Sequence, residues 1–430
     1  MDNQRRNFLK KTGLTGLGIA SGAWLKTWSA PLIDEASDSI VFGSPIIINQ
    51  ANQSVIGSYG EWAAGLMKGK LPSLSFRKKE YTDIKYWKPK AKNRLKERLA
   101  SPTINKIPEV SVTKKYEYDG LHFEELRWQL PYGPLSEAIL IKPLNVKGKL
   151  PAILALHDHG GNKYFGAKKL VKTSDEQNQV IIDHQKAIYE GRAWANEIAK
   201  RGYVVLVTDA FPFGSRRVRL EDVPESLSKG QKDSPETTEN ITNYNKWASA
   251  HEQIMAKSLL SAGTTWPGVF YAEDRSAIDI LCAREDVDAK NIGCGGLSGG
   301  GMRTVFLAGQ DERIKCAVCV GFMTTWKDFV LHKSPSHTWM TYVPLLPNEL
   351  DFPEILGLRA PLPTLVQNDI NDALFTLEEM KEADGILSEI FTKAKARDKY
   401  KCSYYPGPHK FDKAMQEDAF DWFDKWLKSK

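Results

Sequence analysis

The sequence predicts an α/β protein with a doubly wound, mostly parallel sheet, preceded by an N-terminal helical extension. From Pro151 onward, short apolar segments alternate with longer stretches of helical character. The apolar segments lack polar alternation, which is typical of strands buried on both faces. Two long interruptions, 211–250 and 321–357, follow expected strand ends, where the loops of such a sheet build the ligand site.

The segments before this alternation predict helices and then a hairpin. Residues 58–71 and 85–100 have helical character, and the second segment is strongly basic. Residues 110–130 resemble a hairpin that turns at Asp119-Gly120, and 136–144 would add a third strand. We therefore expect three parts, at 1–30, 31–109 and 110–430, of which the last is the main domain.

The alternating part is expected to supply the buried strands of the sheet and the helices that cover it. One helix is expected to end near Gly202, and another to span 272–285. The expected strands are 151–159, 203–210, 291–298, 316–322, 363–369 and 401–407. The composition, 42% hydrophobic and 26% charged, is that of a globular protein.

Residues 1–30 resemble a twin-arginine export signal. Arg5 and Arg6 precede Phe8-Leu9-Lys10, a glycine-diluted apolar run follows from Leu14, and Lys26 comes after it. The run is far shorter than the ~20 residues of a membrane span, so no stable membrane anchor is expected. We expect an exported, periplasmic protein and the twin-arginine machinery as a partner. The alternative is a basic amphipathic helix.

The charge balance gives no case for nucleic acid. The formal net charge is +6, but residues 1–30 hold five basic residues and one acidic residue. The remainder has 54 basic and 52 acidic residues and is nearly neutral. The cysteines are odd in number, and Cys316-x-x-Cys319 lies in an apolar segment without a second pair of ligands, so we expect buried packing.

The segment "GCGGLSGGGMRT" at 293–304 carries the strongest functional signal. Gly296 to Gly300 fit G-x-S-x-G between an expected strand and an expected helix, which is the context of a nucleophile turn at Ser298. Such a turn strains the serine backbone and leaves no room for Cβ atoms two residues before and after it. A phosphate loop would need a following lysine, and a dinucleotide fingerprint would need glycine where Ser298 stands.

A serine nucleophile needs a base and an orienting acid further along the chain. His409 follows the last expected strand, where the base belongs, whereas His332 and His337 lie in an interruption before the acid and are out of order. They are expected to line the pocket or its surface. Asp369 and Asp372 both follow the strand 363–369, and both qualify as the acid.

The transition state also needs N–H donors for its oxyanion. One donor is the backbone of Gly299, and the other is expected from the loop "LHDHGG", at His159 or Gly160. The run from His157 to His159 also invites a metal site. However, adjacent side chains diverge on an extended chain and no third ligand is apparent, so no metal is expected.

Three further residues are candidates for substrate contact: His157, Asp209 and Arg216. The alternative for Asp209 and Arg216 is that they hold their loop by hydrogen bonds to its backbone. Basic residues such as Arg216 or Lys163 could also meet a uronate, so a glucuronate methyl ester remains an open substrate.

Five segments together resemble the α/β-hydrolase superfamily, in its dienelactone-hydrolase-like and acetyl xylan esterase-like branch. In order they are "LHDHGG", "TDAFPFGSRR", "EDRSAIDILCAREDVDAKNIGCGGLSGGG", "DFPEILGLRAPLPTLVQNDINDALF" and "PGPHKFD". The resemblance spans roughly 110–428 and leaves 31–109 uncovered. The "DALF" segment resembles the D-P-L-F turn of related esterases and favours Asp372 as the acid. Dienelactone hydrolases use a cysteine nucleophile, and Ser298 argues against their activity.

The resemblance implies a serine esterase that acts on small esters, often acetyl groups on carbohydrates, without a cofactor. It implies Ser298 as nucleophile, His409 as base, Asp372 as acid, and Gly299 with the 157–161 loop as oxyanion hole. A prolyl-oligopeptidase-like peptidase would share the triad, but 31–109 is too short and too helical for the usual propeller gate. An inactive scaffold that binds a polysaccharide or a protein is the remaining alternative.

Overall fold

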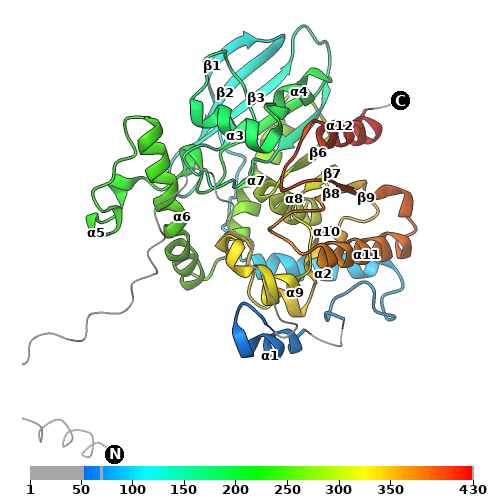
Figure 1. The fold of residues 1–430 in the computed structure, drawn as a ribbon. Coiled ribbons are helices and arrows are strands. Elements are labelled where there is room, and N and C mark those ends of the chain that lie inside the picture. Colours follow the sequence, from blue (N-terminus) through cyan, green and yellow to red (C-terminus); the bar gives the residue numbers. More distant parts are fainter. Residues whose placement is uncertain (1–52, 68–70, 429–430) are drawn as a thin grey trace, which may run out of the picture. The chain divides into compact units, whose positions relative to one another are not determined.

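The computed structural model describes residues 53–67 and 71–428, and these form a mixed sheet covered by helices on both faces (Figure 1). The segment read as an export signal, 1–30, lies outside the described residues. None of the described helices is long and apolar enough to cross a membrane.

The sheet has nine strands in the order β1-β2-β3-β5-β4-β6-β7-β8-β9. Pairing is antiparallel from β1 to β5 and parallel from β5 onward. This arrangement confirms the predicted mostly parallel α/β fold. The strands are β1 (Ser111–Tyr118), β2 (Leu121–Trp128), β3 (Ser136–Pro143), β4 (Leu150–Ala155), β5 (Val204–Thr208), β6 (Val287–Leu297), β7 (Ile314–Val320), β8 (Thr364–Asp369) and β9 (Tyr400–Tyr405).

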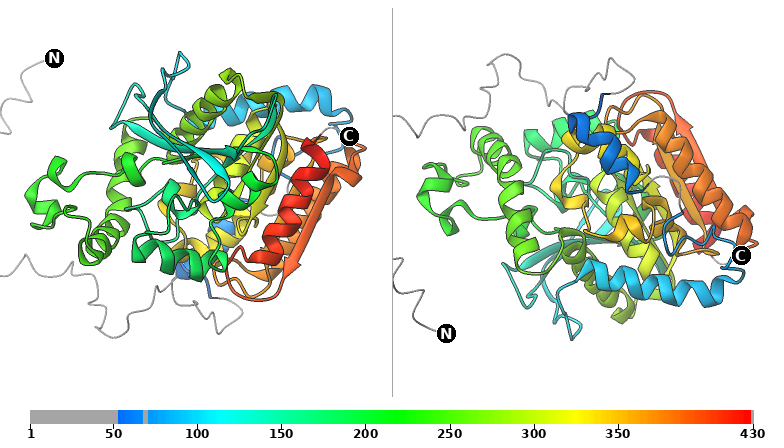
Figure 2. Two further views of the ribbon diagram at one scale, coloured as in Figure 1. Left: turned by 90° about the horizontal axis from the view of Figure 1, so that it is seen from above. Right: turned by 90° about the horizontal axis from the view of Figure 1, so that it is seen from below.

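The helices pack on two apolar faces, as a doubly wound sheet requires. One face receives α2, α7, α8, α10 and α11, and the other receives α3, α4 and α12. In Figure 2, α12 is in front in the view from above, and α2 and α11 are in front in the view from below. Their bounds are α2 (Ile84–Leu99), α3 (Gln179–Tyr189), α4 (Trp194–Lys200), α7 (Trp266–Ala283), α8 (Gly299–Gln310), α10 (Phe352–Gly357), α11 (Leu377–Lys393) and α12 (Lys413–Leu427).

The described part of the N-terminal segment contains α1 (Gly60–Gly65) and α2. Asp83 caps α2 by accepting from the backbone N–H of Lys85 at 2.8 Å. Trp87 and Leu95 of this helix are fully buried in the core that α7 and α8 also form. The indole N–H of Trp87 donates to the carbonyl of Leu74 at 2.6 Å. The apolar side of α2 therefore completes one layer of the fold.

The hairpin and the buried strands lie where the sequence predicts them. Asp119 and Gly120 both have positive φ, 50° and 75°, which suits a two-residue turn between β1 and β2. Cys316 and Cys319 are buried in β7, and both thiols are free. Burial raises the pKa of each thiol, as expected of packing residues.

The interruption 211–250 is more ordered than its polar composition suggests. It contains α5 (Glu225–Ser228) and most of α6 (Thr238–Ser261). Thr237 caps α6 by accepting from the N–H of Asn240 at 3.2 Å. Ile241, Tyr244 and Ala248 recur at helical spacing and are buried. The second interruption, 321–357, consists of short helical turns, with α9 (Trp326–Asp328) among them.

Candidate active site

Ser298 lies in a sharp turn between the end of β6 and the start of α8. Its backbone has φ 58° and ψ −118°, a conformation that residues with a Cβ adopt only under strain. The N–H of Ser298 donates to the carbonyl of Val320 at 2.9 Å, which ties the turn to the end of β7. The side chain thus stands at the carboxyl edge of the sheet and at the N-terminus of a 12-residue helix.

The glycines around Ser298 permit this turn. A Cβ on Gly296 or on Gly300 would lie 2.0 Å from the carbonyl oxygen of Leu156. A Cβ on Gly301 would lie 2.5 Å from the carbonyl oxygen of Val320. Real Cβ atoms do not come so close, so backbone from two neighbouring strands occupies the space that a side chain would need. This is the close packing predicted for positions two before and two after the serine.

His409 and Asp372 form a hydrogen-bonded pair beside this turn. His409 Nδ1 lies 2.6 Å from Asp372 Oδ2, and Asp372 Oδ1 accepts from the N–H of Leu374 at 2.9 Å. The imidazole lies against Gly321, where an added Cβ would be 3.0 Å from its Cε1. Since Ser298 is bonded to Val320, the serine and the imidazole flank adjacent residues at the end of β7.

The electrostatics of the pair suit a general base. Burial disfavours the charged imidazole, but the charge and hydrogen bond of Asp372 outweigh it and raise the pKa of His409. With Nδ1 hydrogen-bonded to the carboxylate, Nε2 is the ring nitrogen that can exchange a proton with a hydroxyl.

Asp369, the other expected candidate for the acid, has a different contact. Its Oδ2 accepts the backbone N–H of Lys410 at 3.1 Å. Burial raises its pKa to about 7. Asp369 thus holds the residue after His409, whereas Asp372 is the carboxylate hydrogen-bonded to the imidazole.

The backbone N–H groups expected to form the oxyanion hole are neighbours. A Cβ on Gly299 would lie 2.9 Å from the backbone nitrogen of His159, so the backbone of the 157–161 loop passes close to Gly299. Gly160 has φ 52°, and a Cβ there would meet Asp158 Oδ2 at 2.2 Å. The structure therefore brings Gly299 and the 157–161 loop together beside Ser298.

A buried lysine that sequence reasoning missed holds the carbonyl side of this loop. The ammonium of Lys169 is within hydrogen-bond distance of three carbonyls: it donates to Asp158, to His159 at 3.3 Å and to Asn162 at 3.2 Å. Its side chain is fully buried, and burial lowers its pKa to about 8. Because three carbonyls share one ammonium, Lys169 holds the backbone of this loop from its carbonyl side.

The three ionisable residues of the loop have separate partners. The carboxylate of Asp158 accepts from Tyr189 and lies 3.2 Å from His184 Nε2. His157 Nε2 accepts the N–H of Ala210 at 3.2 Å, and burial keeps its pKa well below the usual value. Among the residues that the structure describes, no cluster of three or more His, Cys, Asp or Glu could hold a metal ion.

The other two candidates for substrate contact bond to the protein itself. Asp209 accepts the N–H groups of Ala167 at 2.7 Å and Ser215 at 2.8 Å. Arg216 is buried, pairs with Glu273 at 2.7 Å and donates to the carbonyl of Tyr132 at 3.2 Å. The bond of Asp209 to Ser215 is of the kind that the alternative interpretation expects. Arg216 instead ties the loop after β5 to α7 and to the loop between β2 and β3.

The insertion 321–357 contacts, on one side, the turn that carries Asp372. Lys333 Nζ donates to the carbonyl of Ala373 at 2.8 Å, and His337 Nε2 lies 2.8 Å from the carbonyl of Leu374. Burial lowers the pKa of His337 to about 4, so its neutral ring donates this bond. His332 instead lies 3.4 Å from Asp328.

The same insertion contacts the oxyanion loop through a residue of α6 that sequence reasoning also missed. Thr338 donates to Glu252 at 2.7 Å, and Glu252 lies 2.6 Å from His159 Nε2. Trp339, next to Thr338, is 46% exposed. The helical spacing of Ile241, Tyr244 and Ala248 is the sequence signal that could have placed Glu252 on α6.

Comparison with known proteins finds a relative of comparable length and several similar structures. No family model matches the sequence. "Putative hydrolase YtaP" of Bacillus subtilis (strain 168) is 26% identical over 295 residues, which are 68% of this chain and 84% of the relative.

Two solved structures illustrate the structural similarity. A "putative acetyl xylan esterase" from Bacteroides fragilis NCTC 9343 has a TM-score of 0.61 and 16% identity, with 85% of each chain covered. A glucuronoyl esterase from Solibacter usitatus has a TM-score of 0.55 and 16% identity, with 83% of this chain and 97% of the other covered. The strand order, the serine turn and these comparisons together show that the chain has the α/β-hydrolase fold of such esterases.

Proposed function

We propose that the chain is a serine esterase that hydrolyses small esters, acetyl esters of carbohydrates above all, through Ser298, His409 and Asp372. The observation that carries the proposal is the 2.6 Å bond between His409 and Asp372 beside a strained serine turn. Support comes from the backbone of Gly299 facing that of His159 at the same place. A binding scaffold would have no need of this arrangement.

The residues divide the first half-reaction among them. Ser298 Oγ attacks the ester carbonyl carbon while its proton passes to His409 Nε2. The carboxylate of Asp372 stabilises the imidazolium that forms. The carbonyl oxygen becomes an oxyanion and is bound by the N–H of Gly299 and a second N–H, from His159 or Gly160. The alcohol leaves with the proton of the imidazolium, and an acyl-serine ester remains.

The second half-reaction repeats these roles with water. His409 takes a proton from the attacking water, whose oxygen bonds to the acyl carbon, and the same N–H groups bind the second oxyanion. The proton then returns to Ser298 Oγ as its bond to the acyl carbon breaks. The products are a carboxylic acid and the free enzyme, and neither step draws on a metal or an organic cofactor.

The choice of an acetylated carbohydrate rests on the similar structures. One of them is named an acetyl xylan esterase and another a glucuronoyl esterase. A glucuronate ester carries no charge on its esterified carboxyl, so the burial of Lys163 and Arg216 in ion pairs with Glu252 and Glu273 does not decide between the two substrates. We favour an acetylated saccharide because the acetyl xylan esterase has the higher TM-score of the two, 0.61 against 0.55.

We also propose roles for the N-terminal segments. Residues 1–30 would direct export by the twin-arginine machinery, 31–109 would form an extension, and 110–430 the catalytic domain. Replacement of both Arg5 and Arg6 by lysine should keep the protein in the cytoplasm. Cell fractionation would show this, and export of the double variant at the normal level would contradict the signal assignment.

The first test of the activity is hydrolysis of p-nitrophenyl acetate and butyrate by the chain and by Ser298→Ala. We expect the chain to hydrolyse these esters and the variant not to. An organofluorophosphonate should label the chain but not the variant. Acetylated xylo-oligosaccharides, a glucuronate methyl ester and a peptide would then separate the substrate classes. If the chain is labelled but cleaves only the peptide, a peptidase is favoured. If the chain is not labelled and cleaves none of these substrates, a binding scaffold is favoured.

A further inference from the structure

Glu252 is a buried carboxylate on α6 that the proposed mechanism leaves unused. Its Oε1 lies 2.6 Å from His159 Nε2 and 2.6 Å from Lys163 Nζ. Its Oε2 accepts from the hydroxyl of Thr338 at 2.7 Å and from the N–H of Trp339 at 3.3 Å. One oxygen therefore holds the oxyanion loop, and the other holds the insertion 321–357.

The contact with Glu252 also sets the tautomer of His159. The N–H of Gly161 donates to His159 Nδ1 at 3.1 Å, so Nδ1 carries no proton and the ring N–H is at Nε2. That N–H points to Glu252. Gly160 and Gly161 have φ values of 52° and 65°, a turn that needs fixing because glycine backbone is permissive. The series Glu252, His159, Gly161 thus fixes the turn just after the expected oxyanion donor.

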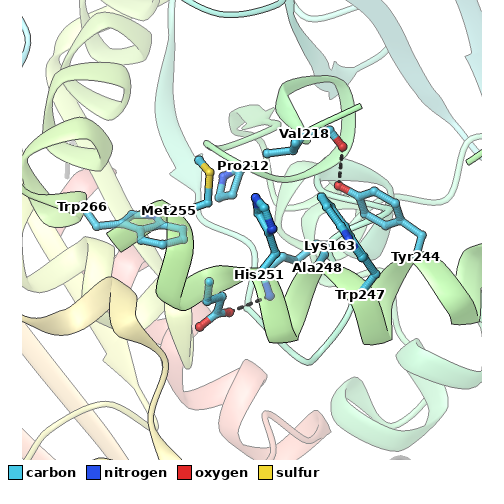
Figure 3. A pocket seen from close by; sticks show the side chains of 10 residues that line it. Lys163, Pro212, Val218, Tyr244, Trp247, Ala248, His251, Met255 and Trp266 are labelled. Atoms are coloured by element: carbon cyan, nitrogen blue, oxygen red, sulfur yellow. Dashed lines mark hydrogen bonds and ion pairs between the residues drawn. The ribbon is translucent and has the colours of Figure 1, made fainter. Parts of the chain in front are cut away.

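The charge of Glu252 is balanced within the protein. Burial opposes its ionisation, but His159 and Lys163 outweigh burial and hold the pKa of Glu252 below its usual range. Figure 3 marks the ion pair of Lys163 by a dashed line, in a cavity also lined by Trp247, His251 and Met255. The cavity measures about 10 Å³, room for about one water, so it holds no substrate group.

We propose that Glu252 is a positioning residue that holds the backbone of His159 against Gly299 and locks it to the insertion at Thr338. This inference rests on the proposed esterase function. The negative charge on the substrate oxygen develops only in the transition state, so a displaced donor lowers kcat more than it changes KM. Replacing a residue that only supports folding would lower the stability of the protein without a larger effect on kcat than on KM.

The test compares Glu252→Gln with Glu124→Gln, a matched loss of a buried carboxylate. Glu124 is buried, pairs with Arg284 at 2.9 Å and lies on β2, in the antiparallel part of the sheet away from the serine turn. With p-nitrophenyl acetate, Glu252→Gln should lower kcat about 10- to 100-fold, below the 10²–10³ of a lost donor. KM should stay within about threefold, and Glu124→Gln should lower the melting temperature but keep kcat within about twofold.

A double-mutant cycle tests the link to the insertion. Thr338→Val removes one contact of Oε2 and should lower kcat less than Glu252→Gln. Added to Glu252→Gln it should have no further effect, because both changes break the same connection. Full additivity would overturn the link.

Hydrogen exchange of the 157–162 backbone tests the positioning without relying on turnover. Exchange there should speed up in Glu252→Gln and stay at the wild-type rate in Glu124→Gln. An unchanged kcat, or a lowered kcat with unchanged exchange, would overturn the proposal. If the wild type cleaves no ester, the proposed function fails, and the exchange rates still decide whether Glu252 holds the loop.

Discussion

Gly300→Ala should damage both the stability and the rate of this protein through one contact. The added Cβ would lie 2.0 Å from the carbonyl oxygen of Leu156 and 3.2 Å from that of His157. Ordinary contact begins near 3.4 Å, so the strand β4 end and the helix α8 must separate by about 1.4 Å. Leu156 cannot yield freely, because its N–H donates to the carbonyl of Gly295 at 2.9 Å.

The size of the effect follows from that displacement. Overpacking of this kind costs about 1–3 kcal/mol, against roughly 1 kcal/mol that alanine gains over glycine inside a helix. The separation also moves the loop that begins at His157 away from Gly299. Because a 1 Å misplacement can cost about 10²-fold in rate, kcat should fall by about that factor.

The matched control is Gly385→Ala, since Gly385 lies in α11 and a Cβ there meets nothing within 4 Å. In this control the free energy of unfolding should rise by up to about 1 kcal/mol, and kcat should stay unchanged. Urea unfolding gives the stability, and p-nitrophenyl acetate hydrolysis gives kcat. A Gly300→Ala protein with the stability and kcat of the wild type would refute the reasoning about the serine turn.

Further outcomes are expected for the proposed acid and base, for the exposed Trp339, and for Lys169, which holds the oxyanion loop. Asp372→Asn should lower kcat by about 10³–10⁴, and Asp369→Asn by much less, when both are assayed on p-nitrophenyl acetate; equal losses would contradict the assignment of the acid. Because Asp372 raises the pKa of His409 and the base acts when neutral, kcat/KM should rise with pH through a midpoint above about 6.5. A midpoint that does not fall in Asp372→Asn would count against this pairing. Trp339→Ala should weaken kcat/KM for acetylated oligosaccharides but not for p-nitrophenyl acetate, and equal effects on both would rule out a role in saccharide contact. Lys169→Met should lower kcat at unchanged KM, because the carbonyls of the oxyanion loop lose their shared donor; a change in stability alone would contradict it.

The parts of the site that sequence reasoning placed well are those with local signals. The glycines around Ser298 fall within five residues, and the turn demands them because two strands press on it. His409 could be placed because it follows the last strand, and the structure brings it to Asp372. The strands of the parallel region could be found because burial on both faces removes polar residues from them.

The parts that were missed depend on partners distant in sequence. The buried face of α6 is a narrow stripe in a polar segment, and the composition of 211–250 hides it. Glu252 and Lys169 look like ordinary surface charges in the sequence. Only the fold brings Glu252 to His159, 93 residues away, and Lys169 under the carbonyls of the loop.

The short stretch from Lys333 to Trp339 has a consequence for how such an enzyme could be altered. It is bonded to the turn of Asp372 through Lys333 and His337, and to the oxyanion loop through Thr338 and Glu252. In the proposed mechanism, this segment of the insertion therefore also supports the turn of Asp372 and the oxyanion loop. Exchanging it for the corresponding loop of another esterase would change the selectivity but also lower turnover, unless the residues that make both contacts are transferred with the loop.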